Sequence, residues 1–218
     1  MTDQTAGRLV SMLRERPRLK ARLKRALNAV GYHTTDWVRV VMYQRAFAFI
    51  EQLGPHSLDV LEISGGPQWQ ERFNFRSYQR TDYPAFDICS GTLAHQFDLI
   101  IADQIFEHLQ YPARAAANVY SMLRPGGHFI IATPFLIRIH GSPIDCSRWT
   151  PEGLIHLLEE GGFAKDRIHA DSWGNRACLK ANLSHWRKRG FFGSLRNEPG
   201  LPVMAWAFAA KPQENQQV

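Results

Sequence analysis

Short apolar runs, each ended by turn-forming residues, recur through the middle of the chain. Residues 58–63, 97–103 and 129–132 read as buried strands, because each run is short, largely apolar and bounded by turn residues. A helix between the last two begins at Pro112 and ends before the sequence Pro125-Gly126-Gly127. Strands that alternate with helices in this way predict an α/β fold, in which helices cover a parallel sheet.

Weaker patterns on either side extend this prediction. Further strands are expected at residues 77–81, 86–88, 166–173 and 203–209. The last strand is strongly apolar, and it would pair antiparallel with the sixth after a connecting lobe at 190–202. The remaining helices are expected at residues 31–56, 67–75, 150–158 and 175–189.

The first strand ends in a turn of small residues, Ser64-Gly65-Gly66. Glycine has no Cβ, so it permits positive φ and lets the backbone approach a ligand closely. The carboxyl ends of parallel strands are also where open α/β sheets bind ligands. Glu62 lies in the same strand, and a buried carboxylate is costly unless it meets a donor. A cationic or hydroxyl-bearing ligand would supply that donor, and so would a backbone amide or a lysine.

Acidic residues follow the second predicted strand. Asp82 lies 16 residues past Gly66, a position suited to holding the hydroxyls of a ribose. An Asp before Tyr-Pro is also a common turn residue, so both interpretations stand. Asp87 and Ile88 come next, where they could meet the amine and the ring face of an adenine.

The segment after the strand at 129–132 is long and polar, with an aromatic residue at its end. It covers residues 137–149 and includes His140, Asp145 and Arg148. Loops of this length commonly carry function. The structural alternative is that Asp145 pairs with Arg148 and that His140 bonds to backbone, which would only brace the loop.

Composition indicates a globular protein. Hydrophobic residues make up 44% and charged residues 21% of the 218 positions. No apolar run approaches the ~20 residues of a membrane span, and the N-terminus is too charged for a secretory signal, so we expect a cytoplasmic protein. The three cysteines lie far apart, which predicts neither a disulfide framework nor a zinc site.

The positive charge of the chain is concentrated at its N-terminus. Residues 1–31 hold eight Lys or Arg and two Asp or Glu, which accounts for the whole net charge of +6. We therefore divide the chain into a basic amphipathic helical arm at 1–31, a domain at 32–212 and a polar tail at 213–218. The arm could cap the domain with its charges in water, or residues 8–30 could contact the anionic inner membrane peripherally. Nucleic acid is disfavoured as a partner, because no aromatic residue is interleaved with the basic ones.

A family resemblance rests on the middle of the chain. The residues that carry it are Phe97-Asp98-Leu99-Ile100, Glu107-His108-Leu109, Pro112, Leu123-Arg124-Pro125-Gly126-Gly127 and Pro134. This pattern resembles the class I S-adenosylmethionine-dependent methyltransferases, and it is most similar to the bacterial small-molecule and glycan group. The resemblance covers about residues 58–165. It implies a Rossmann-like, seven-stranded, mostly parallel sheet whose last strand is antiparallel, with additional N-terminal helices, and it implies S-adenosyl-L-methionine as the cofactor.

The resemblance also assigns cofactor-binding positions. Glu62 and the turn Ser64-Gly65-Gly66 match the motif that holds the methionine part, and Asp82 matches the acid that holds the ribose. The other positions that the resemblance places at the cofactor are Asp87, Ile88, Asp103, Gln104 and His108. Ser64 and Gln68 replace two glycines of the usual motif, whereas Gly66 keeps the middle one. The G-x-G-x-x-G turn of dinucleotide-binding enzymes is absent.

The implied reaction is in-line transfer of a methyl group to an oxygen or nitrogen of a small-molecule or glycan acceptor. A hydroxyl acceptor needs a base, and His140 is the first candidate and His108 the second, with Asp145 as a further catalytic candidate. Acceptor-binding candidates are Arg138, His140, Asp145, Arg148 and Trp149. No metal is expected, because the end of a strand does not guarantee that Asp103, Glu107 and His108 converge. The alternatives are a non-catalytic module of the same fold that docks a partner through its basic arm, and a peripheral membrane enzyme acting on a lipid-linked glycan.

Overall fold

The computed structural model describes residues 33–66, 68–141 and 143–213. The predicted basic arm, with its proposed membrane contact at 8–30, and nearly all of the polar tail lie outside these residues. Among the helices described, none has the length and apolar character needed to cross a membrane.

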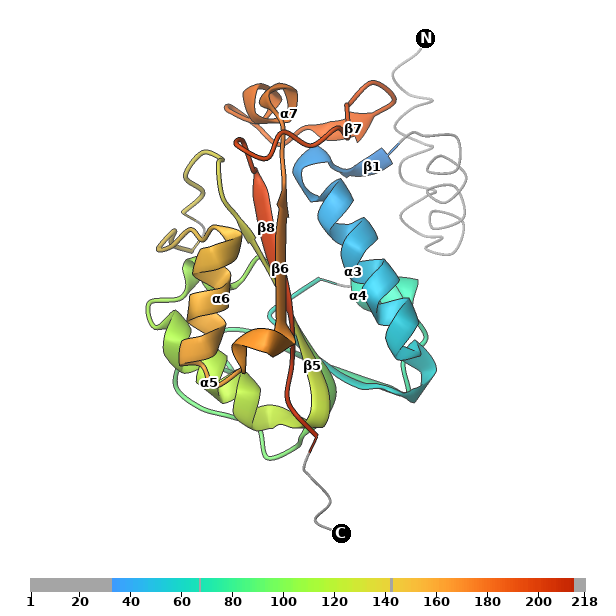
Figure 1. Ribbon diagram of the computed structural model, residues 1–218, viewed down its shortest axis with the longest axis vertical. Coiled ribbons are helices and arrows are strands. Elements are labelled where there is room, and N and C mark those ends of the chain that lie inside the picture. Colours follow the sequence, from blue (N-terminus) through green and yellow to red (C-terminus); the bar gives the residue numbers. More distant parts are fainter. Residues whose placement is uncertain (1–32, 67, 142, 214–218) are drawn as a thin grey trace.

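A mixed sheet forms the centre of the domain (Figure 1). Its strands, in spatial order, are β3 (Ser77–Thr81), β2 (Asp59–Ile63), β4 (Phe97–Asp103), β5 (Leu123–Pro134), β8 (Met204–Ala210) and β6 (Ile168–Trp173). The first four are mutually parallel, and β8 runs antiparallel to both β5 and β6. The predicted α/β class and the antiparallel last strand are therefore confirmed.

The sheet has six strands rather than seven, because residues 86–88 do not form the predicted strand. They belong to a turn. The carboxylate of Asp87 accepts hydrogen bonds from the backbone N–H of Cys89 at 2.9 Å and from the hydroxyl of Ser90 at 2.6 Å. An Asp side chain bonded to the backbone two residues on stabilises a turn in competition with a strand.

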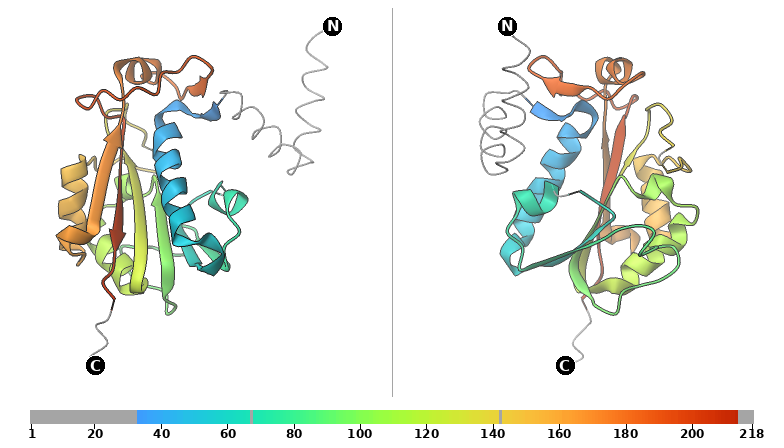
Figure 2. Two further views of the ribbon diagram at one scale, coloured as in Figure 1. Left: turned by 45° about the vertical axis from the view of Figure 1, so that its right-hand side comes forward. Right: turned by 180° about the vertical axis from the view of Figure 1, so that it is seen from behind.

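Helices cover both faces of the sheet, as Figure 2 shows. Helices α3 (Val40–Leu53) and α4 (Gln68–Arg72) lie on one face, and α5 (Pro112–Met122) and α6 (Pro151–Glu160) lie on the other. Alternation along β4 explains the two layers, since successive side chains of a strand point to opposite faces. Leu99 and Ile101 pack in the core that contains α3, whereas Ile100 and Ala102 pack in the core that contains α5 and α6.

Two predicted helices are shorter than the sequence suggested. The helix expected at 31–56 is preceded by strand β1 (His33–Asp36) and a 3-10 turn, η1 (Trp37–Arg39). The helix expected at 175–189 is α7 (Arg176–Ala181), and strand β7 (Lys188–Gly190) follows it. β1 and β7 pair antiparallel in a separate two-stranded sheet. This tertiary pairing, together with Asn182, which accepts from the N–H of Arg187 at 2.9 Å, overrides helix propensity there.

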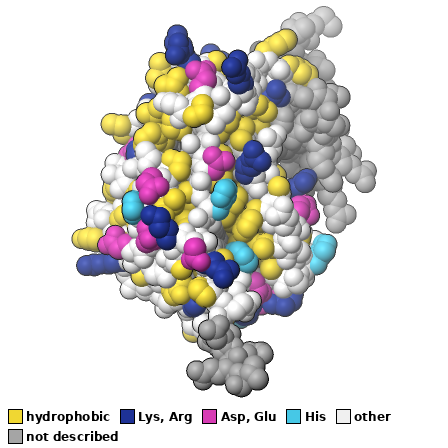
Figure 3. Space-filling model, in the orientation of Figure 1, with side chains coloured by type: hydrophobic (Ala, Val, Ile, Leu, Met, Phe, Trp, Pro, Cys, Tyr) yellow, Lys and Arg dark blue, Asp and Glu magenta, His cyan; other side chains and the backbone are white. Residues whose placement is uncertain are grey.

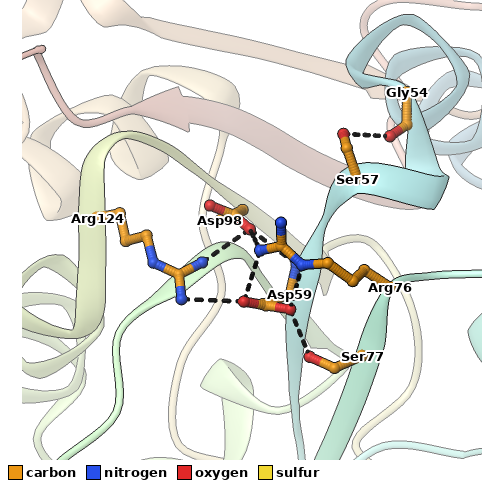
Figure 4. A network of polar contacts seen from close by, with 7 residues as sticks. All are labelled: Gly54, Ser57, Asp59, Arg76, Ser77, Asp98 and Arg124. Atoms are coloured by element: carbon orange, nitrogen blue, oxygen red, sulfur yellow. Dashed lines mark hydrogen bonds and ion pairs between the residues drawn. The ribbon is translucent and has the colours of Figure 1, made fainter.

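An ion-pair network joins the amino ends of the strands, at the edge opposite the predicted site (Figure 4). Asp59, at the start of β2, forms ion pairs with Arg76 at 2.6 Å and with Arg124 at 2.9 Å. Asp98, in β4, forms ion pairs with the same two guanidinium groups at 3.0 and 2.8 Å. These arginines lower the pKa of Asp59, as does the hydroxyl of Ser77. The network holds three neighbouring strands at the edge remote from the carboxyl ends.

The surface of the domain carries charges of both signs. Figure 3 shows acidic and basic side chains interspersed among hydrophobic ones on the face in view. This agrees with the near-neutral domain that the sequence predicts.

Candidate functional site

Glu62 lies at the carboxyl end of β2 with no exposed surface. The hydroxyl of Tyr78, on the neighbouring strand β3, donates to its Oε2, and its Oε1 has no hydrogen-bond partner among the described residues. Burial raises the pKa of Glu62 to about 8, and the negative charge of Asp103 adds to this shift. The backbone N–H of Gly66 supplies the backbone contact that the sequence left open, but one carboxylate oxygen still lacks a donor.

The turn after β2 has no room for side chains at its two glycines. A Cβ on Gly65 would lie 1.7 Å from Oε1 of Glu62, and one on Gly66 would lie 2.4 Å from Oε1 of Gln68. Ser64, which replaces a glycine of the usual motif, has φ of 50°, in the left-handed region that favours glycine. The backbone therefore keeps a glycine-type turn despite the serine, and the N–H of Ser64 donates to the carbonyl of Thr81.

Asp103 ends β4 beside this turn and is 6% exposed. Its Oδ2 accepts from the hydroxyl of Tyr43 at 2.7 Å and from Nε2 of Gln68 at 3.2 Å. Its Oδ1 has no partner in the part of the chain that the structure describes. Burial and the nearby Asp103 raise the pKa of Tyr43 above its ordinary range, so this phenol acts as a donor.

Two buried carboxylates, Glu62 and Asp103, thus each keep one oxygen without a hydrogen-bond partner among the described residues, near a turn that contains two glycines. An unsatisfied buried carboxylate oxygen is costly in a folded protein. A ligand that carries an ammonium group and hydroxyl groups would satisfy both oxygens. The residues present therefore fit the methionine and ribose parts of S-adenosylmethionine.

The residues expected at the ribose and the adenine differ in how available they are. Asp82 follows β3 and is exposed, with only a 3.4 Å ion pair to Arg80. The carboxylate of Asp87 is engaged by its own turn, and the Ser90 hydroxyl and the Cys89 N–H lower its pKa. Ile88 is 3% exposed and packs in the core that contains α5.

Gln104 follows Asp103 in an unusual backbone conformation. Its φ is 61°, its N–H donates to the carbonyl of Ala132 at 2.9 Å, and its side-chain Nε2 lies 3.1 Å from the sulfur of Met204. A non-glycine residue at positive φ is uncommon and occurs often at functional sites. Gln104 therefore redirects the chain from β4 into the 3-10 turn η3 (Phe106–His108).

A cluster of Glu107, His108 and His140 lies beside this turn. Oε1 of Glu107 is 3.7 Å from Nε2 of His108 and 3.8 Å from Nε2 of His140. The two imidazole rings meet edge to face, with centroids 5.0 Å apart. Glu107 has no exposed surface, and neither of its carboxylate oxygens has a hydrogen-bond partner among the residues described.

Burial shifts the pKa values of two side chains in this cluster. It raises the pKa of Glu107 to about 8, and Asp103 contributes in the same direction. It lowers the pKa of His140, and the neighbouring His108 lowers it further. Both shifts disfavour the charged forms of these side chains.

The described parts of this loop, residues 137–141 and 143–149, lie against the cluster. Asp145 pairs with Arg148, as the structural alternative predicts, and it also accepts from the backbone N–H of His140 at 2.9 Å. The backbone N–H groups of Cys146 and Ser147 donate to the carbonyl of Glu107 at 2.7 and 3.2 Å. The loop is therefore braced, and the bracing holds the ring of His140 beside Glu107.

Two of the predicted acceptor residues lie elsewhere on this loop. The guanidinium of Arg138 stacks over Trp186 at 4.3 Å and donates to the carbonyl of Asn182 at 2.8 Å, which ties it to the segment around α7. Trp149 lines a cavity of about 490 Å³ together with Tyr111 and Arg114. The lining of this cavity includes none of the carboxylates or histidines described above, so the cavity is distinct from their cluster.

The sequence reasoning missed several residues that complete the site. Tyr43 comes from α3. Arg39, one turn earlier, lies near Asp103. Burial alone would lower the pKa of Arg39, but the charge of Asp103 and the contact with Tyr43 raise it. Tyr78 lies on β3, and Glu107 follows β4. Of these residues, only Glu107 could have been recognised from the sequence, since a carboxylate beside His108 after a buried strand is unusual. Tyr43 and Tyr78 occupy positions that are ordinary for an amphipathic helix or strand.

Comparison with known proteins supports the resemblance. The profile of the methyltransferase domain family matches residues 37–168. A probable S-adenosylmethionine-dependent methyltransferase of Mycolicibacterium smegmatis is 30% identical over 99 residues, which are 40% of this chain and 38% of that protein. The match thus spans less than half the length of that curated relative.

Solved structures share the fold. A S-adenosylmethionine-dependent methyltransferase from Mesorhizobium loti superposes with a TM-score of 0.50 at 17% identity, over 76% of this chain and 97% of that one. The Haemonchus contortus phosphoethanolamine N-methyltransferase 2, in complex with S-adenosylmethionine, superposes with a TM-score of 0.51 at 14% identity, over 78% of this chain and 53% of that one. At these identities the likeness concerns the fold.

Proposed function

Because the chain belongs to the class I S-adenosylmethionine-dependent methyltransferase family, we propose that it transfers a methyl group to an oxygen or nitrogen of a small-molecule or glycan acceptor. S-adenosylmethionine is the cofactor of this family. The observation that carries the proposal is a pair of carboxylate oxygens, Oε1 of Glu62 and Oδ1 of Asp103, that have no hydrogen-bond partner among the described residues and lie near the glycine turn. A module that had lost the cofactor would gain stability by replacing such carboxylates, so the non-catalytic alternative is not favoured.

The cofactor supplies a methyl group that is already activated on a sulfonium. Glu62 and Asp103 accept from its polar groups, while Ser64, Gly65 and Gly66 let the backbone approach it. Asp82 is exposed beyond β3 and takes the ribose hydroxyls. The remaining contacts are assigned to Asp87, Ile88, Gln104 and His108. With a donor this reactive, much of the protein's contribution is to align the two substrates.

The residues at 137–149 act on the acceptor. His140 is the group that takes a proton, because its Nε2 is buried and has no hydrogen-bond partner among the described residues. Asp145 is a positioning residue, since it bonds to the backbone of His140 and not to its ring. Arg148 binds the acceptor beside His140, and Arg138 and Trp149, which lie away from the cluster, contact only its more distant parts. His108 orients His140 through the edge-to-face contact.

The first test is a calorimetric titration of the full chain with S-adenosylhomocysteine. Micromolar binding is expected, and Gly65→Ala should weaken it about tenfold or more, because the new methyl group displaces the carboxylate of Glu62. Gly91→Ala is the matched control, since no atom lies within 4 Å of the Cβ it would add. A flat titration of folded wild-type protein would contradict the proposal.

A further inference from the structure

Glu107, His108 and His140 bring three potential metal-binding atoms together at the carboxyl ends of the strands. One carboxylate oxygen and two imidazole nitrogens all lie within 4.8 Å of one another. We propose that these three side chains bind a divalent transition-metal cation such as Zn²⁺. Such a site is separate from the cofactor contacts made by Glu62 and the glycine turn.

The distances are close to those that a metal ion requires. With bonds of about 2.1 Å to nitrogen and oxygen, two ligands of a tetrahedral ion lie about 3.4 Å apart. Oε1 of Glu107 lies 3.7 Å from one imidazole nitrogen and 3.8 Å from the other. Both contacts are too long for hydrogen bonds, and each needs a shift of only a few tenths of an ångström to become a pair of metal ligands.

The tautomer of His108 suits a ligand. Its Nδ1 is hydrogen-bonded to the backbone carbonyl of Ile144, and only a protonated nitrogen can donate to a carbonyl. In the neutral ring, Nε2 then carries a lone pair, and it faces Glu107. Metal-binding histidines commonly use one nitrogen for the metal and donate the other to a carbonyl or carboxylate.

The second observation is the isolation of Glu107. It is fully buried, and neither of its oxygens has a hydrogen-bond partner in the described part of the chain; the same holds for Nε2 of His140. The carbonyl of Glu107 accepts from Cys146 and Ser147, so the loop that carries His140 is attached to the same residue. A cation at this point would satisfy Oε1 of Glu107 and Nε2 of His140 at once.

The ligand types indicate which metals suit the site. Two imidazoles and one carboxylate favour Zn²⁺ or Fe²⁺ over Mg²⁺ or Ca²⁺, which prefer all-oxygen sites. Three protein ligands leave positions open for water or for an oxygen of a substrate. A hydroxyl bound there would lose its proton more readily, so the ion would replace His140 in activating the acceptor; this role rests on the proposed function.

The test is binding of the metal alone to the full chain after treatment with a chelator. Zn²⁺ titrated by calorimetry should bind with a stoichiometry of one, and Co²⁺ should develop visible absorption bands when bound. Mg²⁺ should bind far more weakly. His140→Phe keeps an aromatic ring against His108 and Trp186 but removes the nitrogen, and it should weaken Zn²⁺ binding about 100-fold or more. Glu107→Gln should do the same.

The matched control is His156→Phe on α6. His156 also lies between two carboxylates, Glu152 and Glu159, both 3.3 Å away, but on an exposed surface. This substitution should leave Zn²⁺ binding unchanged. Binding that persists in His140→Phe, or that is lost in His156→Phe, would place the ion elsewhere and overturn the inference.

Wild-type protein that binds S-adenosylhomocysteine but no Zn²⁺ would also overturn the inference, and it would leave the proposed function intact. The cluster would then be a buried carboxylate beside two imidazole rings, without a metal ion. The reverse result, Zn²⁺ without S-adenosylhomocysteine, would support the metal site and contradict the proposed function. The wild-type titrations alone decide whether the protein binds Zn²⁺. The test therefore remains valid even if a variant fails to fold.

Discussion

The phenol of Tyr43, in the second turn of α3, donates a 2.7 Å hydrogen bond to Oδ2 of Asp103, at the last residue of β4. The two residues are 60 positions apart in the sequence. This bond orients the carboxylate, and its other oxygen has no hydrogen-bond partner among the described residues. The helix that covers the sheet thereby becomes part of the candidate cofactor site.

Tyr43→Phe should weaken binding of S-adenosylhomocysteine about tenfold, because Asp103 loses the donor that orients it. The free energy of unfolding should change less, since the phenyl ring retains its contacts with Phe47 and Trp69. Calorimetric titration measures the first effect and urea unfolding the second. Tyr111→Phe, at an exposed tyrosine, is the control and should leave the affinity unchanged. Equal affinities for the Tyr43→Phe and wild-type proteins would show that Asp103 does not depend on this bond.

Ser64→Gly should stabilise the protein slightly. A left-handed conformation costs a non-glycine residue about 1–2 kcal/mol, and the greater entropy of unfolded glycine offsets about 0.5–1 kcal/mol of the gain. A net rise of roughly 0.5 kcal/mol in the free energy of unfolding is expected by denaturant titration.

The control for that variant is Ser121→Gly, in the last turn of α5. There the same substitution meets an ordinary helical backbone, and it should lower the free energy of unfolding by about 0.5 kcal/mol or slightly more. Two changes of the same sign would mean that backbone strain at Ser64 is not the cause.

Stability should fall as pH rises through the range in which Glu62 titrates. Its pKa is about 8 in the folded protein, above the ordinary value of 4.5. At pH 4 both the folded and unfolded chains hold the proton. Above about 4.5 the unfolded chain releases it first, so unfolding is favoured increasingly up to about pH 8, where the effect levels off. Urea unfolding at a series of pH values measures this.

Glu62→Gln cannot titrate at this position, so its stability relative to wild type should increase between pH 5 and pH 8. Comparison of the two proteins removes the contribution of Glu107, which both retain. A constant difference across this range would contradict the assignment. Binding of S-adenosylhomocysteine should be weaker in Glu62→Gln, because the amide cannot ionise to pair with the ammonium group of the ligand.

The ion-pair network at the opposite edge should matter for stability and not for binding. Asp59→Asn removes a carboxylate that receives both Arg76 and Arg124. Because the pKa of Asp59 is lowered on folding, its contribution is present above its ordinary pKa of 3.8 and is lost as pH falls through and below that value.

Asp59→Asn should therefore be less stable than wild type at pH 7, and the difference should shrink in acid. Its affinity for S-adenosylhomocysteine should be unchanged. Asp166→Asn, at a carboxylate that is 81% exposed, serves as the control and should match wild type. Reduced cofactor affinity in Asp59→Asn would show that the two edges of the sheet are coupled.

Local sequence predicted most of the strands and one half of the site. Glu62 and the turn at 64–66 follow directly from an apolar run that stops abruptly, because the residues that end a parallel strand lie at one edge of the sheet. Asp103 is assigned to the cofactor through the family resemblance. The antiparallel pairing of β8 with β6 is also predicted, from the strongly apolar last segment. These inferences need only the pattern within a single element.

The remainder depended on contacts between distant elements. Tyr43 reaches Asp103 only because α3 packs on that face, and His140 reaches Glu107 only because the loop at 137–149 folds back over η3. Residues 86–88 form a turn in place of the predicted strand, because Asp87 bonds to Ser90. The helix predicted at 175–189 ends early, because β7 pairs with β1. In each case tertiary packing or side-chain bonding decided between local alternatives of similar free energy.

The position of β8 between β5 and β6 has a consequence for biosynthesis. Strand β6 pairs along its length with β8, so at residue 173 of the growing chain it has no neighbour in the main sheet. Both it and the outer side of β5 present open backbone groups until residues 204–210 have left the ribosome. Unpaired strand edges promote association between chains. Nascent chains stalled before residue 204 should therefore require chaperones more than the finished protein does.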